Sequence, residues 1–168
     1  MHVDDLMFAE SEGIPNNPRL PVLIYHGAVD VSGDGATRIE DRFHANGWRG
    51  VWRDGVFDFQ HYHTRAHEVL AVARGKARLL IGGPAGKELE VMAGDVLVLP
   101  AGTGHCRIAA SADFLVIGGY PPGQHADIQR GPATNADREA IASVPLPQFD
   151  PVFGTDGPTV TLWQRVTR

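Results

Sequence analysis

The sequence predicts an all-β domain, a sandwich or a barrel, with one helix near its N-terminus. From Trp48 onward, short runs rich in Val, Leu, Ile, Phe and Trp alternate with clusters of Gly, Pro and Asp, which is typical of strands joined by tight turns. Gly (20) and Pro (12) together make up about 19% of the 168 residues, against roughly 12% in average proteins. Few stretches are therefore left that are long enough for helices, and the length fits one domain.

We expect this single domain to have three parts. They are an irregular N-terminal extension (1–47) with a helix over about 36–46, a barrel core (48–120), and a C-terminal segment (121–168) that returns to the barrel. The helix is predicted because Ile39 and Phe43 stand about one turn apart, and because Gly47 sits where a C-terminal cap belongs.

Local patterns predict three further elements. They are a strand at Val22–His26, a short helix near Asn135–Ala142 and a last strand around Thr159–Val166. The segment Ala66–Leu80 is ambiguous, because its Ala, Leu and Arg content favours a helix. Gly75 in the middle of this segment, and the short strands around it, favour a strand instead.

Composition excludes several classes of function. Lys and Arg (15) are outnumbered by Asp and Glu (20), whereas nucleic-acid binders carry a basic excess or a basic face. No apolar run approaches the roughly 20 residues of a membrane span, and the N-terminus lacks the pattern of a signal peptide. We therefore expect a cytoplasmic protein that binds neither nucleic acid nor membrane. The single cysteine, Cys106, cannot close an intramolecular disulfide and is expected to be a buried structural thiol.

Three of the eight histidines lie within seven residues of one another, and this cluster predicts a metal site. Side chains alternate along a strand, so His61 and His63 project from one face and can clamp a divalent ion. Glu68 follows after a short connection as a third ligand, and His105 on a neighbouring strand completes a site of three nitrogens and one oxygen. Imidazole suits Zn, Cu, Fe and Ni, and the carboxylate adds tolerance for Mn.

The same residues also have a plainer interpretation. A lone His-x-His pair is common on exposed strands without metal, and three neighbouring histidines also occur as a surface patch that binds metal adventitiously. His67 is expected to point away from Glu68 and to be exposed and inert. His26, His44 and His125 show no metal-binding spacing.

Two spaced motifs resemble the signature of the cupin superfamily. The first reads Gly55-x5-His61-x-His63-x4-Glu68-x6-Gly75, and the second reads Gly94-x5-Pro100-x-Gly102-x2-His105. Eighteen residues separate the two motifs, which is compatible with the variable segment of that family. The second motif usually ends in Asn, where this chain has Ala109, at a position that is not a ligand in the family. The flanking segments resemble those of small single-domain bacterial cupins: Asn46-Gly47-Trp48 before the barrel, and Asp150-Pro151-Val152-Phe153-Gly154 with Asp156-Gly157-Pro158 after it.

This resemblance implies a double-stranded β-helix, a jelly roll of two antiparallel sheets with a metal ion inside near one mouth. The implied ligands of one divalent transition metal (Fe, Mn, Ni or Zn) are His61, His63, Glu68 and His105. The resemblance also divides the ambiguous segment into two strands, Glu68–Arg74 and Ala77–Ile81, that meet near Gly75.

Strand alternation predicts which other side chains face the interior. The expected inward residues are Phe57, Phe59, Leu70, Val72 and Arg107. An apolar cavity with few polar groups is typical of a small-ligand pocket. A guanidinium can bind a carboxylate through two hydrogen bonds, so Arg107 is the candidate substrate anchor. The alternative is that Arg107 extends from the mouth of the barrel to a surface acid.

We expect a metal-dependent enzyme, of the oxygenase or the isomerase and decarboxylase type, because four protein ligands leave coordination positions open. Its substrate would be a small oxygenated or carboxylated molecule, and the positive metal centre favours an anionic one. The alternative is a non-catalytic cupin module that binds a small ligand or a metal as a sensor or accessory protein. A third interpretation is an assembly scaffold, and a homodimer is expected in any of these cases.

Overall fold

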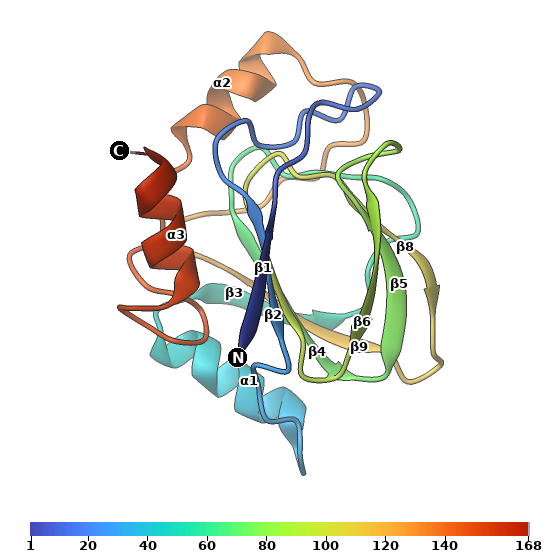
Figure 1. Cartoon of the computed structure of the whole chain (residues 1–168), viewed down its shortest axis with the longest axis vertical. Coiled ribbons are helices and arrows are strands. Elements are labelled where there is room, and N and C mark those ends of the chain that lie inside the picture. Colours follow the sequence, from blue (N-terminus) through green and yellow to red (C-terminus); the bar gives the residue numbers. More distant parts are fainter. Residues whose placement is uncertain (168) are drawn as a thin grey trace.

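Two antiparallel sheets face each other across a barrel in the computed structural model, which describes residues 1–167 (Figure 1). The larger sheet has the strand order β1 (His2–Leu6), β2 (Val22–His26), β7 (Val96–Leu99), β4 (Glu68–Arg74), β9 (Leu115–Tyr120) and β3 (Arg49–Asp54). The smaller sheet has the order β6 (Lys87–Met92), β5 (Lys76–Ile81) and β8 (His105–Ala110). The predicted all-β jelly roll is confirmed.

Within residues 1–167, three helices lie outside the barrel: α1 (Gly35–Ala45), α2 (Asn135–Ser143) and α3 (Pro158–Thr167) (Figure 1). The helices predicted at 36–46 and 135–142 are α1 and α2, each placed within one residue at both ends. None of the helices in the described part of the chain has the length and apolarity that a membrane crossing needs.

Both faces of the larger sheet are buried at its central strands, and this explains why those strands read as continuous apolar runs. On the inner face, Leu70 and Leu97 pack inside the barrel with Leu79 of the smaller sheet. The outer face packs against Phe43 of α1 and Trp163 of α3. The sheet is therefore the middle layer of the molecule, with the barrel interior on one side and helices on the other (Figure 1).

The ambiguous segment Ala66–Leu80 forms two strands, β4 and β5, as the family resemblance implies. They meet at Gly75, which has a φ of +75° and whose added Cβ would lie 2.4 Å from the Ser111 hydroxyl oxygen. Burial of β4 on both faces outweighs the helical propensity of its Ala and Leu residues.

The expectation of an irregular chain before Val22 is wrong for residues 2–6, which form the edge strand β1. This strand pairs with β2 in antiparallel register, with His2 opposite His26. Two of its five residues are aspartates and its side chains are at most half-buried, so it lacks the apolar run that marks the other strands. Segment 1–47 therefore contributes two strands to the larger sheet.

The strand expected at Thr159–Val166 is also wrong, because this segment lies in helix α3. Pro158 occupies the first position of the helix, where a missing N–H costs nothing. Val160 and Trp163 stand one turn apart and are both buried, and the indole N–H of Trp163 donates to the Pro21 carbonyl (3.0 Å). Burial of this apolar face decides the structure against the strand preference of the β-branched residues.

A buried carboxylate holds the segment before α3 in place. One oxygen of Asp150 accepts hydrogen bonds from the Tyr25 hydroxyl (2.5 Å) and the backbone N–H of Thr159 (2.9 Å). The other oxygen accepts from the backbone N–H groups of Val152 (2.8 Å) and Phe153 (2.9 Å). The carboxylate thus connects β2 to the start of α3.

Replacing this carboxylate should destabilise the fold. Asp150→Ala removes the acceptor of four hydrogen bonds, three of them buried, and we expect it to lower the free energy of unfolding by about 2–4 kcal/mol. The matched control is Asp156→Ala, at an exposed position in the same loop, which should change it by less than about 0.5 kcal/mol. Urea unfolding measures both; equal effects would contradict this role.

Candidate metal centre

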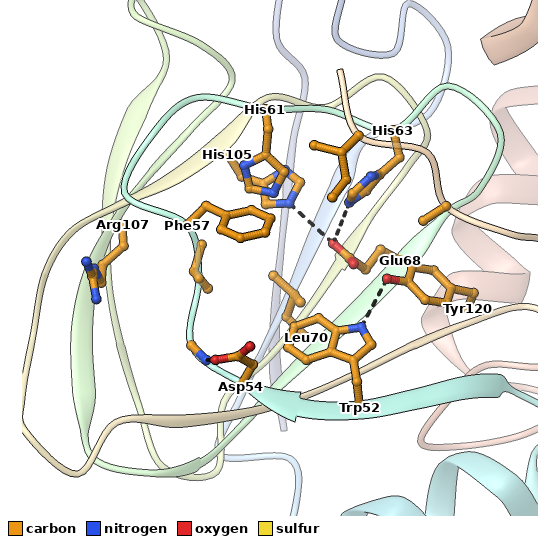
Figure 2. A pocket seen from close by; sticks show the side chains of 14 residues that line it. Trp52, Asp54, Phe57, His61, His63, Glu68, Leu70, His105, Arg107 and Tyr120 are labelled. Carbon is orange, nitrogen blue, oxygen red and sulfur yellow. Dashed lines mark hydrogen bonds and ion pairs between the residues drawn. The ribbon is translucent and has the colours of Figure 1, made fainter. Parts of the chain in front are cut away.

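Three histidines and one glutamate gather at one end of the barrel interior (Figure 2). Glu68 begins β4 and His105 begins β8, whereas His61 and His63 lie in the connection between β3 and β4. A short antiparallel bridge between His61 and His105 ties this connection to the smaller sheet. All four residues are buried, with exposed fractions of 2–6%. The structure therefore brings together the four residues that the two motifs single out.

The spacing of the donor atoms fits a single metal ion. Nitrogen atoms of His61, His63 and His105 lie within 4.8 Å of one another. One carboxylate oxygen of Glu68 lies 3.3 Å from Nε2 of His63 and 3.3 Å from Nε2 of His105. Two donors that bind one ion at about 2.1 Å are separated by about 3.0–3.4 Å in octahedral or tetrahedral geometry. The two separations between Glu68 and the histidines are in that range, and the three imidazole nitrogens lie within the wider limit of 4.8 Å.

The outer nitrogens of the three histidines fix the orientation of the rings. Each Nδ1 faces a backbone carbonyl oxygen, and the pairs are His61 with Phe59 (3.1 Å), His105 with Thr103 (2.9 Å) and His63 with Asp127. An Nδ1–H that donates to a carbonyl leaves the Nε2 lone pair directed inward, as in protein metal sites. Three inward lone pairs beside a carboxylate repel one another unless a proton or a cation lies between them. The donor set therefore fits a divalent ion.

The charges of the cluster are strongly coupled. Burial, together with the neighbouring His105, lowers the pKa of His61 to about 3. Burial also lowers the pKa of His63, but the Glu68 carboxylate outweighs it and raises that pKa to about 9. Burial raises the pKa of Glu68, yet His63 and His105 hold it well below its usual range. At neutral pH and without a bound cation, His63 is therefore protonated beside an ionised Glu68, and a cation that binds here has to displace the His63 proton.

Sequence reasoning missed Asp127, which anchors the connection that carries His63. Its carboxylate accepts hydrogen bonds from the backbone N–H of Thr64 (2.7 Å), the Thr64 hydroxyl (2.6 Å) and the backbone N–H of Arg65 (3.2 Å). Its carbonyl accepts from Nδ1 of His63. Asp127 lies outside both motifs and outside any predicted element, so local patterns give no signal for it.

A cavity of about 300 Å³ leads from the cluster toward solvent (Figure 2). Leu70 lines it, as strand alternation predicts, whereas Val72 is buried deeper in the barrel core. Phe57 lies at the mouth and is 46% exposed. Phe59 does not line the cavity and instead stacks on Phe57, with ring centres 4.8 Å apart. The alternation fails for Phe59 because its segment is a loop and not a strand.

Arg107 lies at the rim of this cavity. Its guanidinium is partly exposed and 3.9 Å from the Asp58 carboxylate, and Figure 2 shows it turned away from the histidines and Glu68. This position corresponds to the alternative interpretation, an arginine that reaches from the mouth of the barrel to a surface acid. The role of Arg107 as a substrate anchor stays a prediction.

The expectation that His67 is exposed is wrong, because its side chain is fully buried. His67 points to the outer face of the larger sheet, and α3 covers that face: the ring of Trp163 lies edge-on, 4.9 Å away. Nδ1 of His67 accepts a hydrogen bond from the backbone N–H of Ala101 (2.9 Å). Burial lowers the pKa of His67 to about 4, so the ring is neutral at physiological pH.

Two other groups of side chains that are able to bind metal ions lie outside the cluster. Cys106 is buried as expected, and its sulfur accepts a hydrogen bond from the Gln60 amide (3.2 Å). His2 and His26 meet across β1 and β2 on the surface, where their Nε2 atoms bond to Asp4 at 2.9 and 2.7 Å. This exposed group joins residues far apart in sequence, so spacing alone does not reveal it.

Comparison with known proteins gives a family match over part of the chain and a relative along nearly all of it. The family profile described as Cupin matches residues 55–136. The uncharacterized protein YjlB of Bacillus subtilis (strain 168) is 36% identical over 159 residues, which cover 93% of this chain and 93% of YjlB.

Two solved structures resemble parts of the chain. Procruciferin, an 11S globulin from Brassica napus, matches 48% of this chain with 23% identity and a TM-score of 0.39. Acireductone dioxygenase from Bacillus anthracis, with a cadmium ion in its active centre, matches 57% with 19% identity and a TM-score of 0.36. The matches cover 21% of procruciferin and 61% of the dioxygenase.

The coupled charges predict how the histidines titrate. In chelator-treated protein, His63 should stay doubly protonated until the pH approaches about 9, whereas His61 should stay neutral down to about pH 3. Nitrogen-15 NMR of the ring nitrogens measures both. In Glu68→Gln the carboxylate charge is gone and burial dominates, so the pKa of His63 should fall below 6.5. A wild-type His63 that titrates near 6.5 would show that the coupling is absent.

Proposed function

The chain belongs to the cupin family, and we propose that it is a metal-dependent enzyme acting on a small oxygenated or carboxylated molecule. The observation that carries this proposal is the convergence of three Nε2 atoms and one carboxylate at the inner end of a cavity that opens to solvent. A closed structural site has no need of such a cavity, whereas a catalytic site keeps a position open for its substrate. The proposed reaction is an oxygenation, an isomerisation or a decarboxylation.

The four converging side chains would hold one divalent ion, Fe, Mn, Ni or Zn, and the proposed ligands are His61, His63, Glu68 and His105. Bound there, such an ion supplies Lewis-acid polarisation of a ligand oxygen and, for a redox-active metal, electron transfer. Three neutral imidazoles and one carboxylate leave this centre with a net charge of about +1. A small anion is therefore the favoured ligand.

The protein's own groups prepare this site in two ways. Leu70 and Val56 form apolar walls that limit the access of water, which strengthens electrostatic interactions inside the cavity. The carbonyl and carboxylate of Asp127 hold His63 and its connection in place, so that the ring does not have to be ordered when a ligand binds.

A non-catalytic cupin that binds a ligand as a sensor or accessory protein is the second candidate. It is favoured by the scarcity of acid–base groups in the cavity. Apart from the four cluster residues, the titratable side chains among the described lining residues are Asp54, Arg107 and Tyr120. Turnover of a bound ligand by the metal-loaded protein separates the two functions, since a module binds the ligand and releases it unchanged.

Elemental analysis tests the proposal at its first step. Protein purified without added metal should carry close to one transition-metal ion per chain. Glu68→Ala and His105→Ala should each reduce this content at least about tenfold, since each removes a ligand. His44→Ala, at an exposed histidine outside the cluster, is the control and should keep the wild-type content. A wild-type protein without stoichiometric metal, unaffected by either substitution, would end the enzyme proposal.

Asp127 provides a second test, through a residue that is not a proposed ligand. Asp127→Ala removes the acceptor for Thr64 and Arg65 and loosens the connection that carries His63, so metal affinity should fall by about 10–100-fold. Competition with a chelator measures this affinity. Asp58→Ala, at an exposed carboxylate near the mouth, should change it less than about twofold. Equal affinities for wild type and Asp127→Ala would show that this loop does not position His63.

A further inference from the structure

A tyrosine in the cavity wall has its hydroxyl group beside the cluster of histidines and Glu68. Tyr120 ends β9, and its hydroxyl oxygen accepts a hydrogen bond from the indole N–H of Trp52 (3.0 Å). The hydroxyl faces the Glu68 carboxylate (Figure 2), and a phenol carries its proton at neutral pH. Because the indole already donates to its oxygen, the phenol is oriented as a donor toward an acceptor inside the cavity.

A glycine in β9 makes room for the contact between Trp52 and Tyr120. Gly118 lies opposite Trp52 in the ladder between β3 and β9 and two residues before Tyr120. A Cβ added to Gly118 would lie 2.1 Å from atoms of the Trp52 ring. The absence of a side chain lets the indole lie against the strand, with its N–H at the phenol oxygen. The orientation of Tyr120 is thus built into the barrel wall.

Beyond the cluster and Tyr120, the polar side chains among the described lining residues are Asp54 and Arg107. The rest of the lining is small or apolar: Trp52, Gly55, Val56, Phe57, Leu70, Ala126 and Ile128. Arg107 is the only Lys or Arg among the described residues that line the cavity, and it lies at the rim near Asp58. A second carboxylate on a bound ligand would meet apolar walls, or at the rim a single cation, Arg107, beside the acids Asp54 and Asp58.

We infer that the ligand is a 2-oxo or 2-hydroxy monocarboxylic acid with an apolar body. Tyr120, and not Arg107, orients its head, which is the carboxylate together with the adjacent oxygen-bearing carbon. This inference rests on the proposed function. One carboxylate balances the net charge of the metal-loaded centre. The oxygen on the adjacent carbon of the ligand, a carbonyl or a hydroxyl, provides a further hydrogen-bonding group at the same end. The Tyr120 hydroxyl donates to this head, and the body lies between Leu70 and Phe57. The ligand is charged at one end only.

Isothermal titration of the metal-loaded protein with three 2-oxo acids tests this ligand class. The probes share one head: pyruvate has almost no body, 4-methyl-2-oxopentanoate has an apolar body, and 2-oxoglutarate carries a second carboxylate. We expect 4-methyl-2-oxopentanoate to bind at least about tenfold more tightly than either of the others, because it alone buries apolar surface without burying a second charge. Equal affinities, or a preference for 2-oxoglutarate, would overturn the inference.

Matched variants then show whether Tyr120 or Arg107 binds the head of the ligand. Tyr120→Phe keeps the ring and should weaken pyruvate and 4-methyl-2-oxopentanoate by the same factor, about tenfold, while metal content stays at the wild-type level. Arg107→Gln should change both affinities less than about twofold. The reverse pattern would return the anchor role to Arg107. Loss of metal in Tyr120→Phe would mean that the hydroxyl serves Glu68 instead, and would overturn the inference.

Two further measurements keep these outcomes distinct. Trp52→Phe keeps a ring over Gly118 but removes the N–H, so it should weaken both acids by a smaller factor than Tyr120→Phe. An effect confined to the acid with the apolar body would show that Trp52 acts by packing alone, against the inference. Metal loading is measured first: a wild-type protein that takes up no metal overturns the proposed function and this inference together. A loaded protein that does not discriminate among the acids overturns this inference alone.

Discussion

The mutual repulsion of four electron-donating groups in a buried space is the constraint on which the site depends. Three imidazole lone pairs and a carboxylate point toward one another in an interior from which water is largely excluded, and such an arrangement is unfavourable without a proton or a cation. The chain keeps the groups together because a backbone carbonyl oxygen faces Nδ1 of each histidine and fixes the orientation of its ring. Glu68, at the start of a strand with both faces buried, has little freedom to move away.

The layered architecture explains how a small domain holds such a site. Two adjacent residues at the start of β4 lie on opposite sides of the larger sheet. Glu68 faces the barrel interior, whereas His67 packs against Trp163 of α3 on the outer side. The helices therefore pack behind the sheet that carries the candidate metal site, although they lie outside the barrel (Figure 1). Asp150 contributes to this packing, because it ties the start of α3 to Tyr25 on the outer face of β2.

The sequence predicts features that depend on nearby residues or on fixed motif spacing. The four cluster residues, the helix α1 and the strand pair around Gly75 are of this kind. Features created by contacts between distant segments are not predictable in this way. Helix α3 has a strand-like composition and becomes a helix because Trp163 is buried against the sheet, and His67 is buried because α3 covers it. Tyr120 takes its role from contacts with Trp52 and Glu68, which only the barrel brings close.

X-ray absorption spectroscopy at the metal edge of the purified protein tests the central claim most directly. Convergence of the four donors predicts a stoichiometric ion with scattering from about three imidazole rings and from one carboxylate oxygen at about 2.0–2.2 Å. Glu68→Ala should remove the carboxylate oxygen or the metal itself. A stoichiometric ion without imidazole scattering, or an ion whose spectrum is unchanged in Glu68→Ala, would contradict this account of the site.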